Sequence, residues 1–267
     1  MTTFNYESGT VRRVWLIGGT AESAVLAKAI AHSQIHCVVS VTTEAARLLY
    51  PNVATLQVWV GHLNFTNFDE FLYQQQITAV LDASHPYAVE ISQGAIAVCQ
   101  KLQIPYLRYE RPVLEEGEGR GNIYLDSFNT LICGNYLENQ RVLLTVGYRQ
   151  LHLFQPWQGK AALFARLLPS GTALEAAFKA GFTPDRIICL RPPISIDLEK
   201  ALWRQWNISL VVTKSSGKAG GEDVKQKVAA ELGVSLVVIN RPEITYPQQT
   251  SDLAVALEFC CKHVLCT

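Results

Sequence analysis

The sequence predicts the α/β fold class, with two Rossmann-like three-layer domains that each contain a parallel sheet and with an inter-domain crevice. Short apolar runs alternate with helical patterns along the chain, as in βαβ units. The alternation breaks at the acidic, glycine-rich segment 115–121 and then restarts, which predicts a second half of the same kind. Polar residues follow several apolar runs, and the carboxyl ends of parallel strands are where such folds bind ligands.

The first half of the chain is expected to form a series of strands joined by helices. Each strand is a short apolar run, and each helix carries apolar residues at helical spacing. The strands are expected at 13–17, 36–41, 55–60, 79–82 and 105–109, and the helices at 22–32, 68–76 and 88–102. Segment 115–121 cannot bury itself and is expected to be an exposed loop.

The second half repeats the alternation. Its strands are expected at 122–126, 141–145, 161–165, 186–190, 209–213 and 235–240, and its helices at 128–137, 172–180, 197–205, 221–232 and 252–263. The hinge between the halves is expected between about residues 122 and 141. We therefore expect an N-terminal domain over 11–138 and a C-terminal domain over 139–267. The residues leave open whether the halves exchange a strand at the hinge.

The composition argues against several classes of partner. The chain has 267 residues, with 23 Lys and Arg against 23 Asp and Glu, so no net field recruits nucleic acid or an acidic membrane. Hydrophobic residues make up 49% of the chain, yet no apolar run reaches membrane-spanning length, and we expect a cytoplasmic protein. The seven cysteines form no Cys-x-x-Cys pair and are expected to be reduced core thiols, with no metal site.

A strand, a glycine turn and a helix are expected in succession near the N-terminus. The apolar run 14–17 leads into Gly18, Gly19, Thr20 and Glu22. Glycines allow a tight turn and let backbone N–H groups approach a phosphate, and the positive end of the following helix favours the anion. The third glycine of the dinucleotide fingerprint is not present, so a plain tight turn is an alternative interpretation.

A second junction follows the apolar run 79–82, where Asp82, Ser84, His85 and Pro86 come together. Pro86 suits the first turn of a helix because it needs no N–H donor and its φ is already helical. The three polar side chains are then expected at the carboxyl end of a strand, beside free helix N–H groups. Ser and Asp before a helix are also ordinary caps, so the junction predicts either a ligand site or a capped helix.

Two junctions of the second half have the same form. Thr145 and Gly147 end one predicted strand, and Lys214, Ser216 and Gly217 lie in a basic Ser/Gly loop after another. The loop has the composition of a phosphate cradle without the Walker spacing, which disfavours a nucleoside triphosphatase. Lys214 is instead a candidate to bind a carboxylate or a phosphate as a point charge.

Three Arg-Pro pairs come just after predicted strands, at Arg111, Arg191 and Arg241. A single pair of this kind is most simply a surface arginine in a strand-ending turn. Because the carboxyl ends of parallel strands face one crevice, the three together are expected to line an anion-binding site between the halves.

Taken in order, these motifs resemble the precorrin-6A reductase family of cobalamin biosynthesis. The resemblance rests on segments 18–22, 82–88, 109–112, 143–147, 213–217 and 241–242, which read Gly-Gly-Thr-x-Glu, Asp-x-Ser-His-Pro-Tyr-Ala, Tyr-Glu-Arg-Pro, Leu-Leu-Thr-x-Gly, Thr-Lys-x-Ser-Gly and Arg-Pro. It implies a two-domain oxidoreductase that reduces a double bond of precorrin-6A, or of its cobalt form, to give precorrin-6B with hydride from NAD(P)H. Domain 11–138 would then bind the cofactor, and domain 139–267 would complete the tetrapyrrole site.

The resemblance also implies the ligands. The substrate is a flat, anionic tetrapyrrole ringed by carboxylates, and other cobalamin-pathway enzymes are candidate protein partners. Ser40, Thr42 and Thr43, at the end of the second predicted strand, are expected to meet the adenosine ribose. These neutral residues would not repel a 2′-phosphate as an acidic residue would, and Arg47 is nearby, so NADPH is favoured. Glu44 keeps NADH as an alternative.

Roles for individual residues follow from the same resemblance. The expected cofactor contacts are Gly18, Gly19, Thr20, Glu22, Ser40, Thr42, Thr43, Asp82, Ser84 and His85. The expected substrate contacts are Tyr87, Arg111, Thr145, Gly147, Arg191, Lys214, Ser216, Gly217 and Arg241. His85 is the candidate catalytic proton donor because the ordinary pKa of histidine lies near neutrality, although it could instead only order the start of the helix.

Two rival functions belong to other classes. One is a cofactor-free tetrapyrrole lyase or cyclase resembling uroporphyrinogen-III synthase, which would not need the glycine turn. The other is a non-catalytic NADP-sensing protein, which would bind the dinucleotide but would not need Lys214 or the three Arg-Pro arginines.

Overall fold

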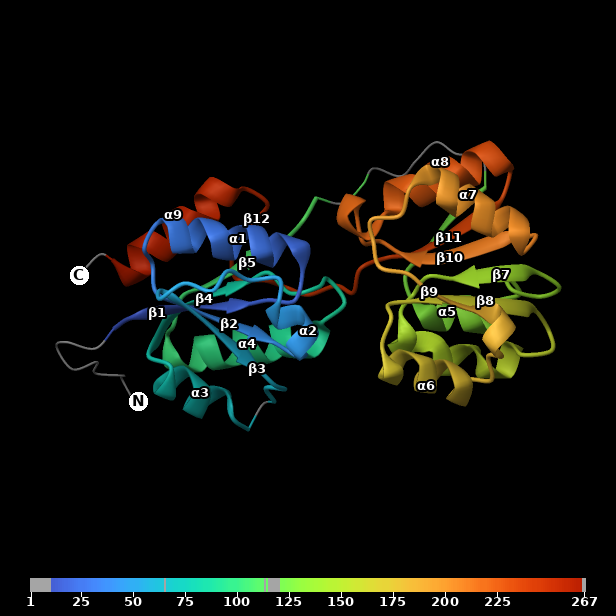
Figure 1. The fold of residues 1–267 in the computed structure, drawn as a ribbon. Helices are drawn as coiled ribbons and strands as arrows, with labels where there is room; N and C mark the ends of the chain where they lie inside the picture. Colours follow the sequence, from blue (N-terminus) through green and yellow to red (C-terminus); the bar gives the residue numbers. More distant parts are fainter. Residues whose placement is uncertain (1–10, 65, 113, 115–120, 266–267) are drawn as a thin grey trace. The chain divides into compact units, whose positions relative to one another are not determined.

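The computed structural model describes residues 11–64, 66–112, 114 and 121–265, and its chain folds into two compact units (Figure 1). Unit 1 consists of Met1–Pro112 together with Glu243–Thr267, and unit 2 is Val113–Pro242. Each unit contains a parallel sheet with helices on both faces, which confirms the predicted α/β class.

The sheet of unit 1 has the strand order β12-β5-β4-β1-β2-β3, with all strands parallel. Its strands are β1 (Arg13–Ile17), β2 (Cys37–Val41), β3 (Leu56–Val60), β4 (Ile77–Asp82), β5 (Tyr106–Tyr109) and β12 (Gln249–Thr250). Its helices are α1 (Ala21–His32), α2 (Glu44–Arg47), α3 (Phe68–Gln74), α4 (Val89–Leu102) and α9 (Leu253–Val264). Ile17 pairs with both Ser40 and Asp82, so the three central strands end level with one another.

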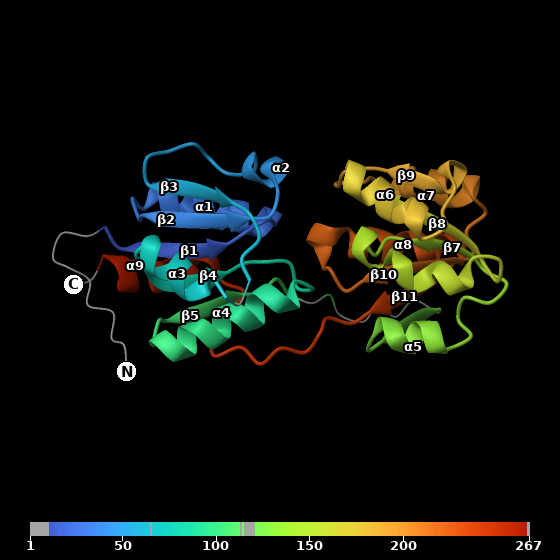
Figure 2. The ribbon, with the colours of Figure 1, turned by 90° about the horizontal axis from the view of Figure 1, so that it is seen from below.

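Alternation along β1 explains the three layers of unit 1. Val14 and Leu16 pack in a core cluster with α1 and α9, and Trp15 and Ile17 pack in a second cluster with α3 and α4. Successive side chains of a strand point to opposite faces, so both faces of this fully apolar strand need a helical cover. Figure 1 shows α1 and α9 on one face, and Figure 2, seen from below, shows α3 and α4 on the other.

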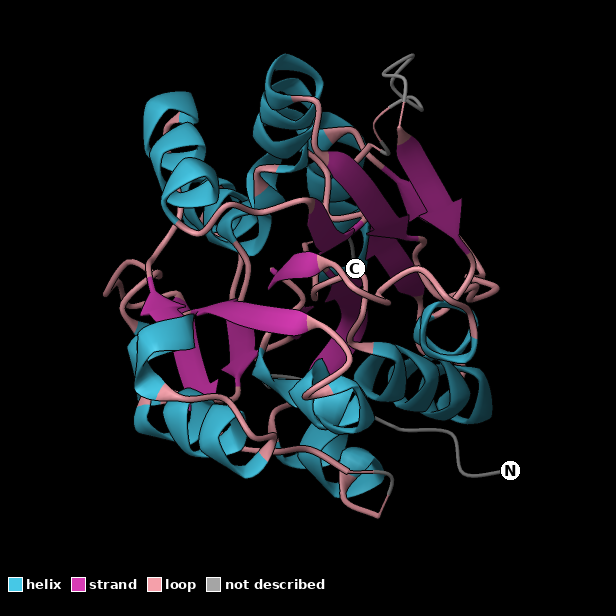
Figure 3. Ribbon diagram, turned by 90° about the vertical axis from the view of Figure 1, so that its right-hand side faces the viewer, coloured by secondary structure: helices cyan, strands magenta, loops and turns pink. Residues whose placement is uncertain are grey.

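Unit 2 has the sheet order β6-β11-β10-β7-β8-β9, again with all strands parallel. Its strands are β6 (Asn122–Leu125), β7 (Arg141–Leu144), β8 (Ala162–Leu167), β9 (Ile187–Cys189), β10 (Leu210–Lys214) and β11 (Ser235–Ile239). Its helices are α5 (Phe128–Cys133), α6 (Gly171–Lys179), α7 (Ile196–Gln205), α8 (Glu222–Leu232) and the 3-10 helices η1 (Tyr148–Trp157), η2 (Pro184–Arg186) and η3 (Lys218–Gly220). In Figure 3 the helices lie on both sides of the strands.

Each sheet reverses its strand order at one point. The central pair is β1 and β4 in unit 1, and β7 and β10 in unit 2. In open parallel sheets, ligands bind outside the carboxyl ends of the strands at such a reversal. The four junctions singled out in the sequence follow β1, β4, β7 and β10, so the fold brings them together in pairs, one pair in each unit.

The two halves of the chain exchange their sixth strands. β6 follows β5 in sequence but pairs with β11, and β12 follows β11 but pairs with β5. The boundary expected between residues 138 and 139 therefore lies inside unit 2, and segment 243–267, expected in the second domain, belongs to unit 1. The physical reason is the apolar face of α9, because Ala256, Phe259 and Cys260 are buried in the core of unit 1. Residues 115–120 of the expected loop lie outside the described residues.

The cysteines of the described chain are free thiols. Cys37, Cys99 and Cys260 are buried, and burial raises the pKa of Cys99 and of Cys260 to about 12. Their thiols therefore stay protonated near neutrality and pack as small apolar groups. In the part of the chain that the structure describes, no cluster of three or more His, Cys, Asp or Glu side chains could hold a metal ion.

Candidate functional site

The turn after β1 requires its two glycines. A Cβ atom on Gly18 would lie 2.4 Å from Oη of Tyr50 and 2.8 Å from Cγ1 of Val39. Gly19 has a φ of +97°, in a region that side chains rarely adopt, and a Cβ there would point into open space. Gly18 therefore allows a close approach inside the protein, and Gly19 supplies the bend on the open side of the turn.

Hydroxyl groups hold this turn in place. The N–H of Gly19 donates to Oη of Tyr50 at 2.7 Å, and that hydroxyl also lies 2.7 Å from Oγ of Ser23. Ser23 and Thr20 form a reciprocal capping box at the start of α1. Sequence reasoning missed Tyr50 because it lies 31 positions from Gly19, whereas the capping positions of Thr20 and Ser23 could have been recognised.

Removing the Tyr50 hydroxyl is expected to loosen the turn. Tyr50→Phe removes the acceptor of the Gly19 N–H and the contact with Ser23 Oγ. Because Gly19 is exposed, water can replace the lost acceptor, and we expect a loss of about 0.5–1.5 kcal/mol, the net contribution of a typical hydrogen bond. Denaturant unfolding should show this loss in the free energy of unfolding. The matched control Tyr136→Phe changes an exposed tyrosine and should stay within about 0.5 kcal/mol. Equal stabilities of the two variants would show that the Tyr50 bond contributes nothing.

The turn after β1 is linked to the end of β4 and opens onto the start of a helix. Thr20 Oγ1 donates to the carbonyl of Ala83 at 2.8 Å, which joins the two junctions of the strand reversal. The N–H groups of Ala21 and Glu22 open α1 and, within the described ranges, have no protein acceptor. A helix start with such donors binds phosphate oxygens well. The residues present therefore fit the pyrophosphate of a dinucleotide.

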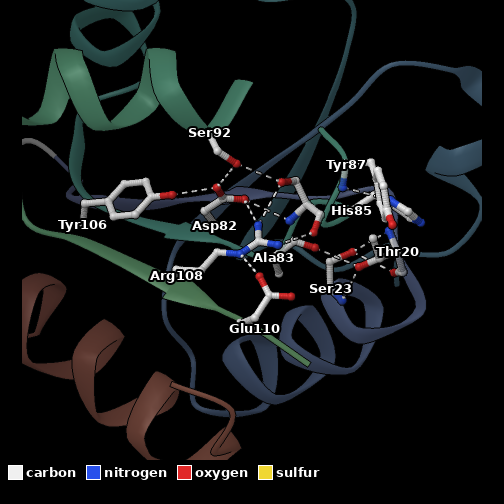
Figure 4. Close-up of polar contacts among 11 residues, drawn as sticks. Thr20, Ser23, Asp82, Ala83, His85, Tyr87, Ser92, Tyr106, Arg108 and Glu110 are labelled. Atoms are coloured by element: carbon white, nitrogen blue, oxygen red, sulfur yellow. Dashed lines mark hydrogen bonds and ion pairs between the residues drawn. The ribbon is translucent and has the colours of Figure 1, made fainter. Parts of the chain in front are cut away.

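Asp82 is completely buried, which changes the role expected for it. Its carboxylate accepts hydrogen bonds from the Ser84 N–H at 2.9 Å, Ser92 Oγ at 2.6 Å, Tyr106 Oη at 2.7 Å and Arg108 Nη1 at 2.9 Å (Figure 4). We expected Asp82 to contact a cofactor, but its exposed fraction is 0%. All four bonds stay inside the protein, so Asp82 organises the junction rather than touching a ligand.

The residues that follow Asp82 lead from the core to the surface of unit 1. Ser84 is buried, and its Oγ accepts from Arg108 Nη1 at 3.0 Å. His85 is exposed; its Nδ1 accepts the N–H of Tyr87 at 3.3 Å, and the two rings lie 5.7 Å apart (Figure 4). His85 and Tyr87 are therefore the side chains of this junction that can reach a ligand. Arg108, which sequence reasoning missed, is buried and binds Ser84, the residue just before His85.

The three residues expected to meet the ribose lie at the end of β2 and differ in their exposure. Ser40 is buried, and its Oγ accepts the indole N–H of Trp15 at 2.8 Å, so its hydroxyl serves packing within the sheet. Thr42 and Thr43 are exposed, and Thr43 caps α2 through the N–H of Ala46. Ser40 thus stabilises the strand, while the two threonines are the residues left to meet a ligand.

In unit 2, the junctions after β7 and β10 are adjacent. Thr145 bonds the carbonyl of Val212 through both its N–H and its Oγ1, and Gly147 has a φ of +81°. Lys214 ends β10, half-buried, with Nζ 5.8 Å from the ring centroid of Phe128. Burial, together with the charge of Arg149, lowers the pKa of Lys214 to about 8.

The loop after β10 uses its own carboxylate where a phosphate cradle would hold an anion. Glu222 is 1% exposed, and its Oε2 accepts the N–H of Gly217 at 2.7 Å. Lys225 closes the loop from beneath by donating to the carbonyls of Gly220 and Gly221 at 2.8 and 3.0 Å. The Gly217 N–H is thus already bound to Glu222 and is not available to an anionic ligand. Ser216 is also buried, so Lys214 is the residue of this predicted group best placed for a ligand.

The three Arg-Pro arginines have different surroundings. Arg111 pairs with Glu22, Nη2 to Oε2 at 3.1 Å, and so braces the start of α1. Arg241 Nε donates to the carbonyl of Ser215 at 2.9 Å, beside the strand reversal of unit 2. Arg191 is exposed and follows the edge strand β9, two strands away from β7. Arg191 therefore lies at the carboxyl end of the same parallel sheet but two strands from the reversal, whereas Arg241 lies beside it.

Comparisons with known proteins converge on one family. The family described as precorrin-6x reductase CbiJ/CobK matches residues 13–261. A cobalt-precorrin-6A reductase of Synechocystis sp. is 47% identical over 94% of this chain and 97% of its own length. A precorrin-6A reductase of Mycobacterium tuberculosis is 32% identical over 86% and 89%. The solved CobK precorrin-6A reductase has the same fold, with a TM-score of 0.77 at 24% identity over 95% and 97% of the two chains.

Proposed function

The chain belongs to the precorrin-6x reductase family, and from this premise we propose that it reduces a carbon–carbon double bond of precorrin-6A in cobalamin biosynthesis. The observation that carries the proposal is the 47% identity with a cobalt-precorrin-6A reductase along nearly the whole of both chains. For that reason the cobalt form is the proposed substrate. The bound cofactor would supply a hydride to one carbon of the double bond and become oxidised, and a proton would add to the other carbon.

Unit 1 supports the binding of the cofactor, whose reduced nicotinamide supplies the hydride. The glycine turn and the first N–H groups of α1 would hold its pyrophosphate. Thr42 and Thr43 would meet the adenosine ribose, with Arg47 exposed on the next helix. The two threonines and Arg47 favour NADPH, because an acidic ribose ligand would repel the 2′-phosphate. Glu44, on the same helix, has its Oε2 3.9 Å from Nη1 of Arg47 and keeps NADH as the alternative. His85 is the proposed proton donor, since its ring is exposed at the end of β4.

Unit 2 supports the binding of the macrocycle's carboxylates. Lys214, Arg149 and Arg241 place cations around the ends of β10 and β11, and charge-assisted bonds to carboxylates are the strongest polar contacts available. Tyr87, in unit 1, is the proposed aromatic contact of the substrate. The proposed location is the cytoplasm, beside the other enzymes of the pathway; among the described residues no helix is long and apolar enough to cross a membrane.

Titration with both cofactors followed by addition of substrate tests the proposal. The purified protein is titrated with NADPH and NADH, and cofactor oxidation is then followed after adding precorrin-6A or its cobalt form. We expect tighter binding of NADPH and oxidation that depends on the macrocycle, faster with the cobalt form. Cofactor binding without turnover would favour the sensing protein, and no cofactor binding would favour the cofactor-free lyase.

The lowered pKa of Lys214 predicts a pH dependence of substrate capture. Its ammonium is charged below about pH 8 and loses its charge as the pH rises through that value, so the attraction for carboxylates falls. We expect the affinity for the macrocycle, measured by titration without the cofactor so that no proton transfer takes place, to decline above about pH 8. Lys214→Arg, which keeps its charge at all accessible pH values, should remove that decline; an unchanged profile would contradict this role.

A further inference from the structure

Arg108 of β5 is a buried cation that the reaction described so far does not use. Its exposed fraction is 1%. Nη1 contacts Asp82 Oδ1 at 2.9 Å and Ser84 Oγ at 3.0 Å, Nη2 donates to the Ser84 carbonyl at 3.1 Å, and Nε donates to Glu110 Oε2 at 2.8 Å (Figure 4). A single guanidinium therefore grips the backbone and the hydroxyl of the residue just before His85.

The cost of burying these charges suggests a purpose beyond stability. A buried ion pair gives little net stabilisation over well-packed apolar residues, although breaking one by removing a partner is strongly destabilising. Here Asp82 also accepts from Ser92 and Tyr106, so its polar contacts are well satisfied. What this network supplies, and an apolar core would not, is a directional hold on the Ser84–Pro86 turn.

Arg108 also contacts both segments that connect the two units. Its side chain contacts Glu110, which immediately precedes the Arg-Pro pair where the chain leaves unit 1. The guanidinium of Arg108 lies 5.2 Å from the ring centroid of Tyr246. The main-chain N–H of Arg108 donates to the carbonyl of Gln248 at 2.9 Å. Tyr246 and Gln248 belong to the segment by which the chain returns to unit 1. One residue thus touches the turn after β4, the outgoing segment and the returning segment.

We propose that Arg108 is a positioning residue that holds the Ser84–Pro86 turn in the shape required by the dinucleotide and ties that shape to both connecting segments. The inference rests on the proposed function, because it assigns the turn to the cofactor. The guanidinium fork is essential to it. A lysine could keep the charge beside Asp82 but could not also serve the Ser84 carbonyl and Glu110.

Three variants and one matched control test the proposal. Arg108→Met removes the network, Arg108→Lys keeps the charge without the fork, and Glu110→Gln weakens one contact at a partner that is 21% exposed. The control is Arg166→Lys, which alters the buried pair with Glu199 in unit 2. For each protein the thermal midpoint, the Kd for NADPH and the KM values for NADPH and for the macrocycle are measured.

Arg108→Lys is expected to recover much of the stability that Arg108→Met loses, yet to bind NADPH about tenfold more weakly than the unaltered chain, a difference of about 1.4 kcal/mol. Its KM should rise more for NADPH than for the macrocycle, because the proposed carboxylate contacts of the macrocycle lie in unit 2 and Tyr87 is its contact beside this turn. Arg166→Lys should lower the thermal midpoint without changing the Kd for NADPH.

Unaltered NADPH affinity in a folded Arg108→Lys variant would overturn the positioning role, as would an equal loss of affinity in Arg166→Lys. If neither Arg108 variant folds, Glu110→Gln decides, because an unchanged KM for NADPH there also overturns it. Failure of the unaltered protein to bind either NADPH or NADH would instead refute the proposed function itself.

Discussion

Gly19→Val is expected to weaken NADPH binding by about 100-fold or more, which corresponds to about 2.7 kcal/mol, while leaving macrocycle binding nearly intact. The φ of Gly19 is +97°, and a β-branched residue held in such a conformation costs about 1–3 kcal/mol. Relaxing the strain would rotate the turn, break the bond from the Gly19 N–H to Tyr50 and displace the start of α1. Cofactor fluorescence titration measures the loss.

Gly159→Val is the matched control for this prediction. Gly159 has a φ of +93° and, like Gly19, has no atom within 4 Å of a Cβ position, but it lies in unit 2 between η1 and β8. It therefore carries the same backbone strain away from the glycine turn and should leave NADPH affinity unchanged. Lys214→Ala should show the opposite selectivity, with weaker macrocycle binding and normal cofactor binding. Equal losses in all three variants would refute the assignment of the two ligands to different units.

Truncation after Pro242 is expected to abolish NADPH binding and the cooperative unfolding of unit 1. The truncated chain lacks β12 and α9, whose residues Ala256, Phe259, Cys260 and Val264 are buried in the core of unit 1. Removing one large core side chain already costs about 3–5 kcal/mol, against a typical domain stability of about 5–15 kcal/mol. Unit 2 keeps all of its strands and should retain its own unfolding transition in circular dichroism.

Two point variants separate the units in the intact chain. A ligand stabilises the unit that binds it, so NADPH should raise the midpoint of the unfolding transition of unit 1. Phe259→Ala should lower the midpoint of that same transition. Phe154→Ala opens an equivalent space in the core of unit 2 and should instead lower the midpoint for unit 2. Each substitution should reduce the free energy of unfolding of its own unit by about 3–5 kcal/mol. A domain boundary at residues 138 and 139 makes the reverse prediction. In that case the chain truncated after Pro242 would still bind NADPH.

Local patterns were sufficient to locate the elements and the functional junctions. The apolar run of β1 was recognised with its observed bounds, Arg13–Ile17, because a strand covered on both faces has no polar side. The glycine turn, the Ser-His-Pro junction and the loop at Lys214 were expected at strand ends, and the structure has them after β1, β4 and β10. These features depend on neighbours within a few residues, which a sequence records directly.

Pairings between distant residues depended on tertiary structure. Asp82 was expected to face a ligand, but Tyr106 and Arg108, 24 and 26 positions away, enclose its carboxylate. Tyr50 supports Gly19 from 31 positions away. None of these three partners carries a local signal, because a tyrosine or an arginine in a short apolar segment is an ordinary residue until the fold brings its polar end to the junction.

By itself the sequence determined the α/β class, the alternation of strands and helices, and the junctions that carry the proposed chemistry, because each depends on local apolar spacing and turn residues. Tertiary structure alone decided which strands pair, and with it the exchange of β6 and β12 between the units. Either sixth strand could satisfy the hydrogen bonds of either sheet edge, so the strand's own residues do not choose its place. The choice follows from the whole pattern of burial, in which the apolar face of α9 completes the core of unit 1 and draws β12 to β5.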